Sequence, residues 1–262
     1  MTATALLKIT QVSKRFGGLQ AVNNVSLEIG RGSIYGLIGP NGAGKTTLFN
    51  LITGLYPADQ GEFLLDGMAY KPSSVHRVTE AGIARTFQNI RLFPDLSAIE
   101  NVMVGRHVRT HGLHSGIVGA VLRTPAFKRV EQEIRDHAQR LLDYVGLGSR
   151  SLQIARTLSY GDQRRLEIAR ALATEPKLLA LDEPAAGMNA TEKNTLRGLL
   201  ERIQSDGKTI LLIEHDVRLV MGLCGQVTVL DHGEVIACGS PADVQRNPSV
   251  IEAYLGTGAT HG

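Results

Sequence analysis

The stretch Gly39-Pro40-Asn41-Gly42-Ala43-Gly44-Lys45-Thr46-Thr47 decides the fold of this chain. Its first eight residues fit the P-loop pattern G-x-x-x-x-G-K-[ST], in which glycines let backbone N–H groups turn inward around phosphate oxygens. We expect Lys45 to reach the β- and γ-phosphates of a nucleotide and Thr46 to offer its hydroxyl to Mg²⁺. A helix that begins near Gly44 points its positive end at the same phosphates.

The flanks of this stretch supply the required context. In a chain with 29 glycines, a chance match to the pattern is expected at roughly a few per cent, so the motif alone is insufficient. The apolar run 33–38 predicts a buried strand before it. After it, one helical face carries Leu48, Leu51, Ile52 and Leu55. The order strand, loop and helix favours a phosphate site over an empty glycine-rich turn.

Two adjacent acids follow another apolar run, in the stretch Leu178-Leu-Ala-Leu-Asp182-Glu183. A buried strand there delivers both carboxylates to its C-terminal end, where α/β sheets place their ligands. Neighbouring strand residues point opposite ways, so we expect Asp182 to hold Mg²⁺ through water and Glu183 to polarise the water that attacks the γ-phosphate. The alternative is a strand that ends in two solvated acids.

A second phosphate site is predicted at Leu158-Ser159-Tyr160-Gly161-Asp162, directly before an apolar-periodic helix over 163–172. The Ser159 hydroxyl and the Gly161 N–H lie at a helix start, where anions bind. One nucleotide does not need two such sites in one chain.

The length and composition limit the number of domains and the kinds of partner. The chain has 262 residues and is 43% hydrophobic, enough for a sizeable core. Because the motifs span nearly all of it, we expect one domain with subdomains over 6–255 and a frayed tail over 256–262. The net charge of +3 is small and the basic residues are dispersed, with Arg164-Arg165 a pair and not a tract, so nucleic-acid binding is not implied.

The cysteine content and the lack of targeting features lead us to expect a cytoplasmic protein. The two cysteines, Cys224 and Cys238, cannot make a disulfide framework and suit a reducing compartment. The start of the chain, residues 1–8, lacks the features of a signal peptide, and no apolar run approaches the roughly 18 residues that a membrane span requires. We therefore expect any membrane association to come through a partner.

The periodicity predicts an α/β fold in three parts. Strands at 6–13, 25–29 and 62–65 suggest an antiparallel β subdomain. A helical subdomain over about 89–175 contains a helix capped by Ser97 and Glu100 and another over 127–145, which Gly146 ends. From Lys177 onward, strands at 178–181 and 209–213 alternate with a helix over 190–204, which indicates a parallel sheet. A hairpin over 227–237 and a helix from Ser240-Pro241 follow.

This ordered set of motifs resembles the ATP-binding cassette (ABC) ATPases, whose signature is Leu-Ser-Gly-Gly-Gln, and the resemblance covers almost the whole chain. It implies a P-loop NTPase cassette with a RecA-like parallel-sheet core, an N-terminal antiparallel β subdomain and a helical subdomain that carries the signature. It also implies ATP and Mg²⁺ as ligands. Two cassettes of this family dimerise head to tail, and the signature of one closes on the ATP held by the P-loop of the other.

The resemblance also implies roles for four isolated residues. Gln88 matches the Q-loop glutamine, whose amide contacts the metal or the attacking water while its loop senses the membrane partner. His215 matches the switch histidine that contacts the γ-phosphate. Phe16 occupies the position of the aromatic that stacks on adenine, with Val22 nearby as an apolar contact. For Phe16 taken alone, core packing is an equal alternative.

Three residues depart from the family pattern. Tyr160 and Asp162 replace residues of the usual signature, and Asp162 brings negative charge close to a phosphate, although it suits a helix N-terminus. Asn189 replaces a common aspartate. With Glu192 three residues on, Asn189 can still cap the helix that follows it.

Within the family, the chain is most similar to the cytoplasmic ATPase subunits of branched-chain amino acid importers. The similar segments are 84–93, 124–127, 158–161, 182–187 and 253–256, with an insertion over roughly 105–129. The resemblance implies two polytopic membrane subunits, a soluble solute-binding protein and a second cassette, either a nonidentical paralogue or a second copy of this chain. The chain would lie on the cytoplasmic face of the inner membrane, and urea or short amides are alternative solutes.

Other function classes stay open. An export ATPase, such as the lipopolysaccharide type, has a similar signature region. Soluble ABC proteins of DNA repair or translation usually carry two cassettes or a long coiled-coil insertion, which this length does not hold. A P-loop kinase would leave the signature and His215 without a purpose.

Two surface features have competing explanations. The apolar pair Leu92-Phe93, just after Gln88, forms either part of a groove for a short membrane-subunit helix or ordinary packing beneath a loop. His107, His111 and His114 have the spacing of metal ligands on one helical face. The neighbouring glycines, Gly105 among them, argue against a helix there and favour a polar loop.

Overall fold

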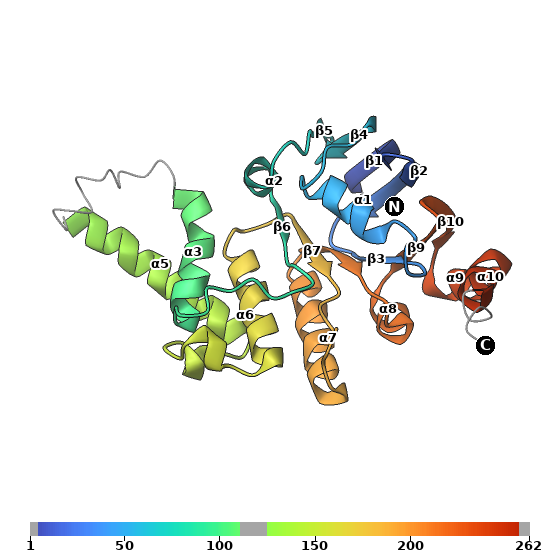
Figure 1. Ribbon diagram of the computed structural model, residues 1–262. Helices are drawn as coiled ribbons and strands as arrows, with labels where there is room; N and C mark the ends of the chain where they lie inside the picture. Colours follow the sequence, from blue (N-terminus) through green and yellow to red (C-terminus); the bar gives the residue numbers. More distant parts are fainter. Residues whose placement is uncertain (1–4, 111–124, 257–262) are drawn as a thin grey trace. The chain divides into compact units, whose positions relative to one another are not determined.

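The computed structural model describes residues 5–110 and 125–256. The chain divides into two compact units, drawn in Figure 1. The sheet unit comprises Met1–Arg85 and Lys177–Gly262, and the helical unit comprises Thr86–Pro176. Both sheets of the described chain belong to the sheet unit.

The first sheet of the described residues has four strands in the order β2-β1-β4-β5. Their bounds are Ala5–Phe16 for β1, Leu19–Gly30 for β2, Gln60–Leu65 for β4 and Met68–Ala69 for β5. All of its pairings are antiparallel. In β1, buried Leu7 and Ile9 flank exposed Lys8, the alternation of a sheet with one covered face. The predicted antiparallel subdomain is confirmed, with longer strands.

The second sheet has six strands in the order β10-β9-β3-β8-β7-β6 among the described residues. Their bounds are Ile34–Ile38 for β3, Ile83–Arg85 for β6, Leu178–Asp182 for β7, Thr209–Ile213 for β8, Gln226–Asp231 for β9 and Glu234–Gly239 for β10. β9, β3, β8, β7 and β6 pair in parallel, and β10 pairs antiparallel with β9. Every residue of β3, β7 and β8 is buried, as expected of parallel strands covered on both faces.

Six helices of the described chain belong to the sheet unit: α1 Lys45–Ile52, α2 Val75–Ala81, α7 Ala190–Ser205, α8 Val217–Leu223, α9 Pro241–Arg246 and α10 Pro248–Gly256. Asn189 and Glu192 form the expected capping box at α7. Ser240 caps α9 with proline at the first helical position. The prediction for Leu55 was wrong, because α1 ends at Ile52 and Leu55 is exposed.

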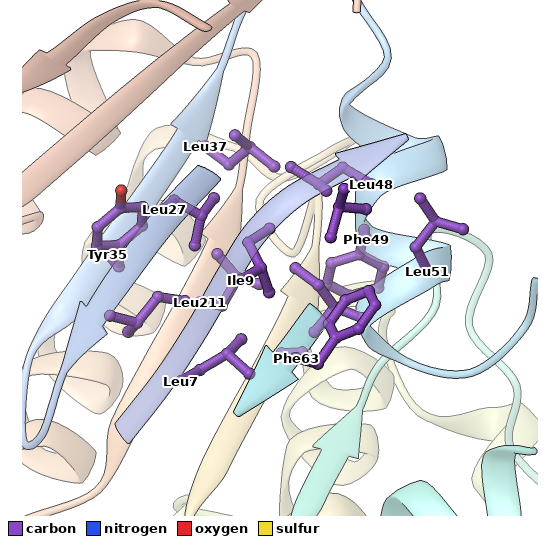
Figure 2. Close-up of a cluster of buried hydrophobic side chains, with 14 of the residues drawn as sticks. Leu7, Ile9, Leu27, Tyr35, Leu37, Leu48, Phe49, Leu51, Phe63 and Leu211 are labelled. Atoms are coloured by element: carbon purple, nitrogen blue, oxygen red, sulfur yellow. The ribbon is translucent and has the colours of Figure 1, made fainter. Parts of the chain in front are cut away.

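Helix α1 and strands of both sheets meet in one hydrophobic core (Figure 2). Phe49 and Leu48 of α1 are fully buried there, with Ile9 from the antiparallel sheet and Leu37 and Leu211 from the parallel sheet. Because α1 begins at the P-loop, this packing fixes the direction in which the helix N-terminus points.

The helical unit contains α3 Ala98–Thr110, α5 Pro125–Tyr144 and α6 Tyr160–Leu172, with short 3₁₀ turns at Gly148–Arg150 and Ala155–Thr157. The Ser97–Glu100 box is confirmed, since the Ser97 N–H donates to Glu100 Oε2 at 2.7 Å. In α5, Ile134, Ala138 and Leu142, which are spaced i, i+4 and i+8, are buried. Gly146 follows α5 with a φ of 77°, as a C-terminal cap requires.

The prediction that Gly105 disfavours a helix was wrong. Gly105 lies inside α3, where an added Cβ would stand 2.3 Å from the carbonyl oxygen of Arg170 on α6. The missing side chain lets the two helices approach closely. His111 and His114 of the predicted polar loop lie outside the described residues. None of the helices formed by the described residues combines the length and the apolar character that crossing a membrane demands.

Candidate functional site

The P-loop joins buried strand β3 to helix α1, as the sequence predicts. Gly44 is the N-cap of α1, with a φ of 97° and no side-chain cap. An added Cβ at Gly44 would stand 2.4 Å from the carbonyl oxygen of Ala21, so glycine is required both by backbone conformation and by space. The first N–H groups of α1 lack helical acceptors and form the type of helix start that binds phosphate.

Lys45 is almost completely buried within its own loop. Its Nζ donates to the carbonyl oxygens of Gly39 at 2.7 Å and Pro40 at 2.8 Å. Burial lowers the pKa of Lys45, while the carboxylates of Glu183 and Asp182 oppose that shift. The ammonium group is therefore placed over the loop by hydrogen bonds to the same backbone that shapes it.

A cavity of about 380 Å³ opens over this loop, a volume within the range of small-molecule sites. Its P-loop wall contains Gly42, Ala43, Gly44, Lys45, Thr46 and Thr47. Gly39, Pro40 and Asn41 do not line it, although they begin the same loop. The other lining residues are Leu19, Gln20 and Ala21 of β2 and His232.

Two of the predicted nucleotide contacts occupy different environments. Phe16 is 42% exposed and meets the Tyr56 ring edge-on, with the centroids 5.4 Å apart. A partly exposed ring of this kind can stack on a base. Val22 is fully buried in the core and has no exposed surface through which to contact a ligand.

Asp182 lies at the end of β7 and is buried. The Arg85 guanidinium lies 3.9 Å from Asp182 Oδ2 and donates to Asn50 and Thr53 of α1 and its C-cap. The Arg85 guanidinium also stacks over the Phe49 ring at 4.8 Å. Arg85 thus connects the acidic end of β7 with the far end of the P-loop helix.

Glu183 lies beyond the strand, where its backbone turns into the left-handed region with a φ of 45°. From the sequence we expect the two carboxylates to diverge because neighbouring residues of a strand point opposite ways. In the structure the strand ends at Asp182, and the turn at Glu183 separates them. Such a conformation is strained in a residue other than glycine. The turn brings Glu183 Oε2 to 3.5 Å from His215 Nδ1, and the structure thus places together two residues predicted separately.

Glu214 hydrogen-bonds, from inside the protein, to the turn that follows Glu183. Its side chain is fully buried, and Oε1 accepts a hydrogen bond from the Ala185 N–H at 2.8 Å. Glu214 Oε2 lies 3.9 Å from His215 Nδ1. Burial raises the pKa of Glu214, which backbone hydrogen bonds and His215 partly counteract.

Two residues near the P-loop were missed by the sequence analysis, because each comes from a segment far from it along the chain. His232 in the turn between β9 and β10 reaches the cavity because the Gly233 N–H donates to the Ala43 carbonyl at 3.0 Å. Tyr254 of α10 hydrogen-bonds with the backbone of Gly39, while burial raises the pKa of its hydroxyl. The sequence predicted the turn at His232 only as part of the hairpin over 227–237.

The signature residues of the helical unit begin helix α6. Ser159 is its N-cap, and its hydroxyl accepts from the Asp162 N–H at 3.2 Å. Asp162 is buried, and its carboxylate pairs with Arg150 and Arg165. Two arginines of the same unit therefore compensate its negative charge.

Gln88 lies in an irregular segment of the helical unit, and the backbone of that segment contacts α6. Arg164 donates to the carbonyl oxygens of Phe87 and Gln88. Phe93, a few residues later, is 46% exposed, whereas Leu92 is half-buried, so the predicted exposed apolar pair is reduced to Phe93.

Two family models and several curated proteins match the sequence. Residues 22–186 match the ABC transporter family, and residues 234–260 match the family described as branched-chain amino acid ATP-binding cassette transporter. The high-affinity branched-chain amino acid transport ATP-binding protein BraF of Pseudomonas aeruginosa is 43% identical over 96% of this chain and 98% of its own length. The corresponding protein LivG of Escherichia coli strain K12 is 44% identical with the same coverage.

A solved structure has the same fold. The crystal structure of the ADP conformation of MJ1267, an ATP-binding cassette of an ABC transporter, aligns with a TM-score of 0.84 and 29% identity. The alignment covers 97% of this chain and 100% of that one.

Proposed function

This chain belongs to the family of ABC transporter ATP-binding proteins, and from that premise we propose that it powers the import of branched-chain amino acids. It binds ATP and couples ATP hydrolysis to transport through separate membrane subunits. The observation that carries this proposal is the continuous similarity to BraF and LivG, which includes nearly the full length of those transport proteins. The match at 234–260 to a branched-chain amino acid family supports the same solute class.

ATP binding is assigned to the P-loop cavity. The N–H groups at the start of α1 and the Lys45 ammonium provide the donors and positive charge that a triphosphate needs. Lys45 would exchange its hydrogen bonds with Gly39 and Pro40 for bonds with phosphate oxygens. Phe16 is assigned to base stacking, and Ser159 and Gly161 to the phosphates of ATP bound by the second cassette.

Hydrolysis is assigned to Glu183 and His215. Glu183 would orient and deprotonate the attacking water, and its partly exposed carboxylate 3.5 Å from the His215 imidazole supports this role. His215 is 59% exposed, so its ring can also contact a γ-phosphate. Gln88 is assigned to the same reaction through its amide.

The donors present fit Mg²⁺. Thr46 offers a hydroxyl at the cavity and Asp182 a buried carboxylate, and oxygen donors of this type suit a hard cation. Within the described ranges no three His, Cys, Asp or Glu side chains form a metal cage, and Mg²⁺ that is bound mainly by phosphates needs none. Held by Thr46 and Asp182, Mg²⁺ would neutralise charge on the β- and γ-phosphates.

The proposal requires partners. A second cassette, either a paralogue or a copy of this chain, would supply the opposing signature, and two polytopic subunits would form the translocation path. A soluble solute-binding protein would deliver the amino acid. The chain itself would lie at the cytoplasmic face of the membrane, with Phe93 among the residues that contact a membrane subunit.

Purification from gently solubilised native membranes tests the assembly. Mass spectrometry of the material that accompanies the chain should identify two polytopic subunits and a second cassette. Companions that are only soluble or ribosomal would refute the transport function. An accompanying lipopolysaccharide-export subunit would replace import with export.

A further inference from the structure

Arg164 and Glu167 form a fully buried ion pair on helix α6. The exposed fractions of their side chains are 0% and 1%, and Arg164 Nη1 lies 2.8 Å from Glu167 Oε2. Burying two charges costs several kcal/mol per ion unless further hydrogen bonds satisfy them. Apolar residues at these positions would avoid that cost. The hydrogen bonds that Arg164 and Glu167 make to other residues therefore indicate what the pair does.

Those hydrogen bonds reach one segment, residues 87–91, which surrounds Gln88 and has no helical or strand structure. Arg164 donates from Nη1 to the Phe87 carbonyl at 2.6 Å and from Nη2 to the Gln88 carbonyl at 2.7 Å. Glu167 Oε1 accepts from the N–H groups of Phe87 at 3.4 Å and Arg91 at 3.3 Å. The pair therefore binds donors and acceptors of the same short segment.

The geometry suits Arg164 in particular. A guanidinium presents its donors in a rigid planar fork, so one side chain can span two successive carbonyl groups, whereas a lysine ammonium is a point charge. The Arg164 guanidinium also lies 5.9 Å from the centre of the Tyr160 ring, and its Nη2 lies 3.3 Å from the Tyr160 hydroxyl, to which it donates. Tyr160 follows Ser159 directly, so the network extends from the Gln88 segment to the start of α6.

We propose that Arg164 and Glu167 are positioning residues that hold the Gln88 main chain against the signature helix, so that the two elements move as one body. The proposal rests on the catalytic and sensing role assigned above to Gln88. It predicts that the pair controls turnover without controlling ATP binding at the P-loop. A movement of the Gln88 segment by a membrane subunit would be transmitted to Ser159 through this pair.

The test compares Arg164→Lys and Glu167→Gln with the matched variant Arg197→Lys in the purified transporter complex. Arg197 lies on α7, and its guanidinium also donates to a carboxylate and a backbone carbonyl, those of Glu201 and Gly222. We expect kcat for ATP hydrolysis to fall about 10-fold or more in the two test variants, with KM within about 2-fold of wild type. Arg197→Lys should keep kcat within about 2-fold.

Hydrogen–deuterium exchange of the same complexes supplies a readout independent of catalysis. The amides of residues 87–91 should exchange at least about 10-fold faster in Glu167→Gln, while those of the α6 interior stay unchanged. Unchanged exchange in that segment, or wild-type kcat in both test variants, would overturn the inference. Equal losses of kcat and ATP affinity with faster exchange throughout α6 would also overturn it, because they indicate a structural role only.

The exchange measurement also separates this inference from the proposed function. If the wild-type complex proved inactive in amino acid import, the proposed function would fail, and exchange at residues 87–91 would still decide whether the pair holds the segment.

Discussion

The two units of this protein shape irregular backbone in opposite ways. In the sheet unit, the P-loop is shaped by glycines and by the core beneath α1, and the charged group of Lys45 lies over the loop's own carbonyls. In the helical unit, the Gln88 segment is shaped by the side chains of Arg164 and Glu167. The first arrangement leaves backbone donors directed at a ligand, whereas the second uses backbone groups to fix a position.

This difference indicates that the two units have separate roles. A cradle made of backbone binds phosphate with little side-chain rearrangement, which suits a site that must bind and release nucleotide. A segment held by two side chains from one helix follows that helix when it moves. The sheet unit is therefore expected to control ATP affinity and chemistry, and the helical unit to control coupling.

Glu183→Gln should produce the largest effect, and only the hydrolysis step should change. Removing a general base is expected to lower turnover by about 10²–10⁴-fold while ATP affinity stays within about 2-fold. The variant should accumulate as an ATP-bound dimer, which size-exclusion chromatography with ATP detects. Glu201→Gln, at an exposed acid that pairs with Arg197, is the control. Normal turnover in Glu183→Gln would show that the base is a different residue.

Gly44→Ala tests whether the cradle depends on backbone shape. The new Cβ would meet the Ala21 carbonyl oxygen at 2.4 Å in a left-handed conformation, which costs about 1–3 kcal/mol. We expect ATP affinity, measured by titration with a fluorescent nucleotide, to fall by about 10-fold or more. Gly18→Ala has nothing within 4 Å of the added Cβ and should bind ATP as wild type does. Equal affinities in the two variants would contradict this account of the loop.

Phe93→Asp separates coupling from binding. Phe93 is 46% exposed, and the Arg170 guanidinium lies 5.8 Å from its ring centre. A carboxylate there should disturb an apolar contact with a membrane subunit, lowering ATP-driven uptake by about 10-fold while ATP binding stays intact. Phe93→Leu retains an apolar surface and should preserve most uptake. Unchanged uptake in Phe93→Asp would discard the docking role.

Glu214→Gln should give the smallest effect, a pH-dependent change in stability. The folded pKa of Glu214 is raised above its ordinary value of 4.5 by burial. Below that value the carboxyl is protonated in both the folded and the unfolded states, so the variant and wild type should differ least. As the pH rises from that value to the folded pKa, the unfolded state releases its proton first, and wild type loses stability relative to the variant.

Thermal unfolding at several pH values measures this difference. At neutral pH the variant should melt higher, by about 2–4 °C, the shift that 1 kcal/mol gives in a domain of similar size. The amide oxygen of the substituted side chain could still accept from the Ala185 N–H, as the Glu214 carboxylate does. A difference in Tm that is the same at every pH would rule out titration of Glu214 as its cause.

Features with a local physical cause were predictable from sequence. The turn at Gly44, the buried runs of β3 and β7, and the capping boxes at Ser97 and Asn189 all depend on residues within a few positions of one another. Hydrophobic periodicity and cap chemistry therefore located them. Even here, the left-handed turn at Glu183 was not foreseen, because it depends on the neighbouring β8, where the Ile213 carbonyl accepts from the Glu183 N–H.

Features with a distant cause were not predictable. His232 reaches the P-loop cavity through the hydrogen bond between Gly233 and Ala43, which are far apart in the chain, and no local pattern marks it. Arg164 was counted with Arg165 among dispersed charges, yet it is fully buried. One signal was present in the sequence. Arg164 and Glu167 are spaced i, i+3, and lie among the buried Leu166, Ile168 and Ala171 of α6.

The measurement that tests the central claim most directly is uptake of radiolabelled leucine into vesicles that contain the reconstituted complex, binding protein and ATP. We predict ATP-dependent accumulation with the wild-type chain and none with Glu183→Gln, although both bind ATP. Accumulation at the wild-type rate in the Glu183→Gln complex, or ATP hydrolysis by the wild-type complex without any leucine uptake, would contradict the account.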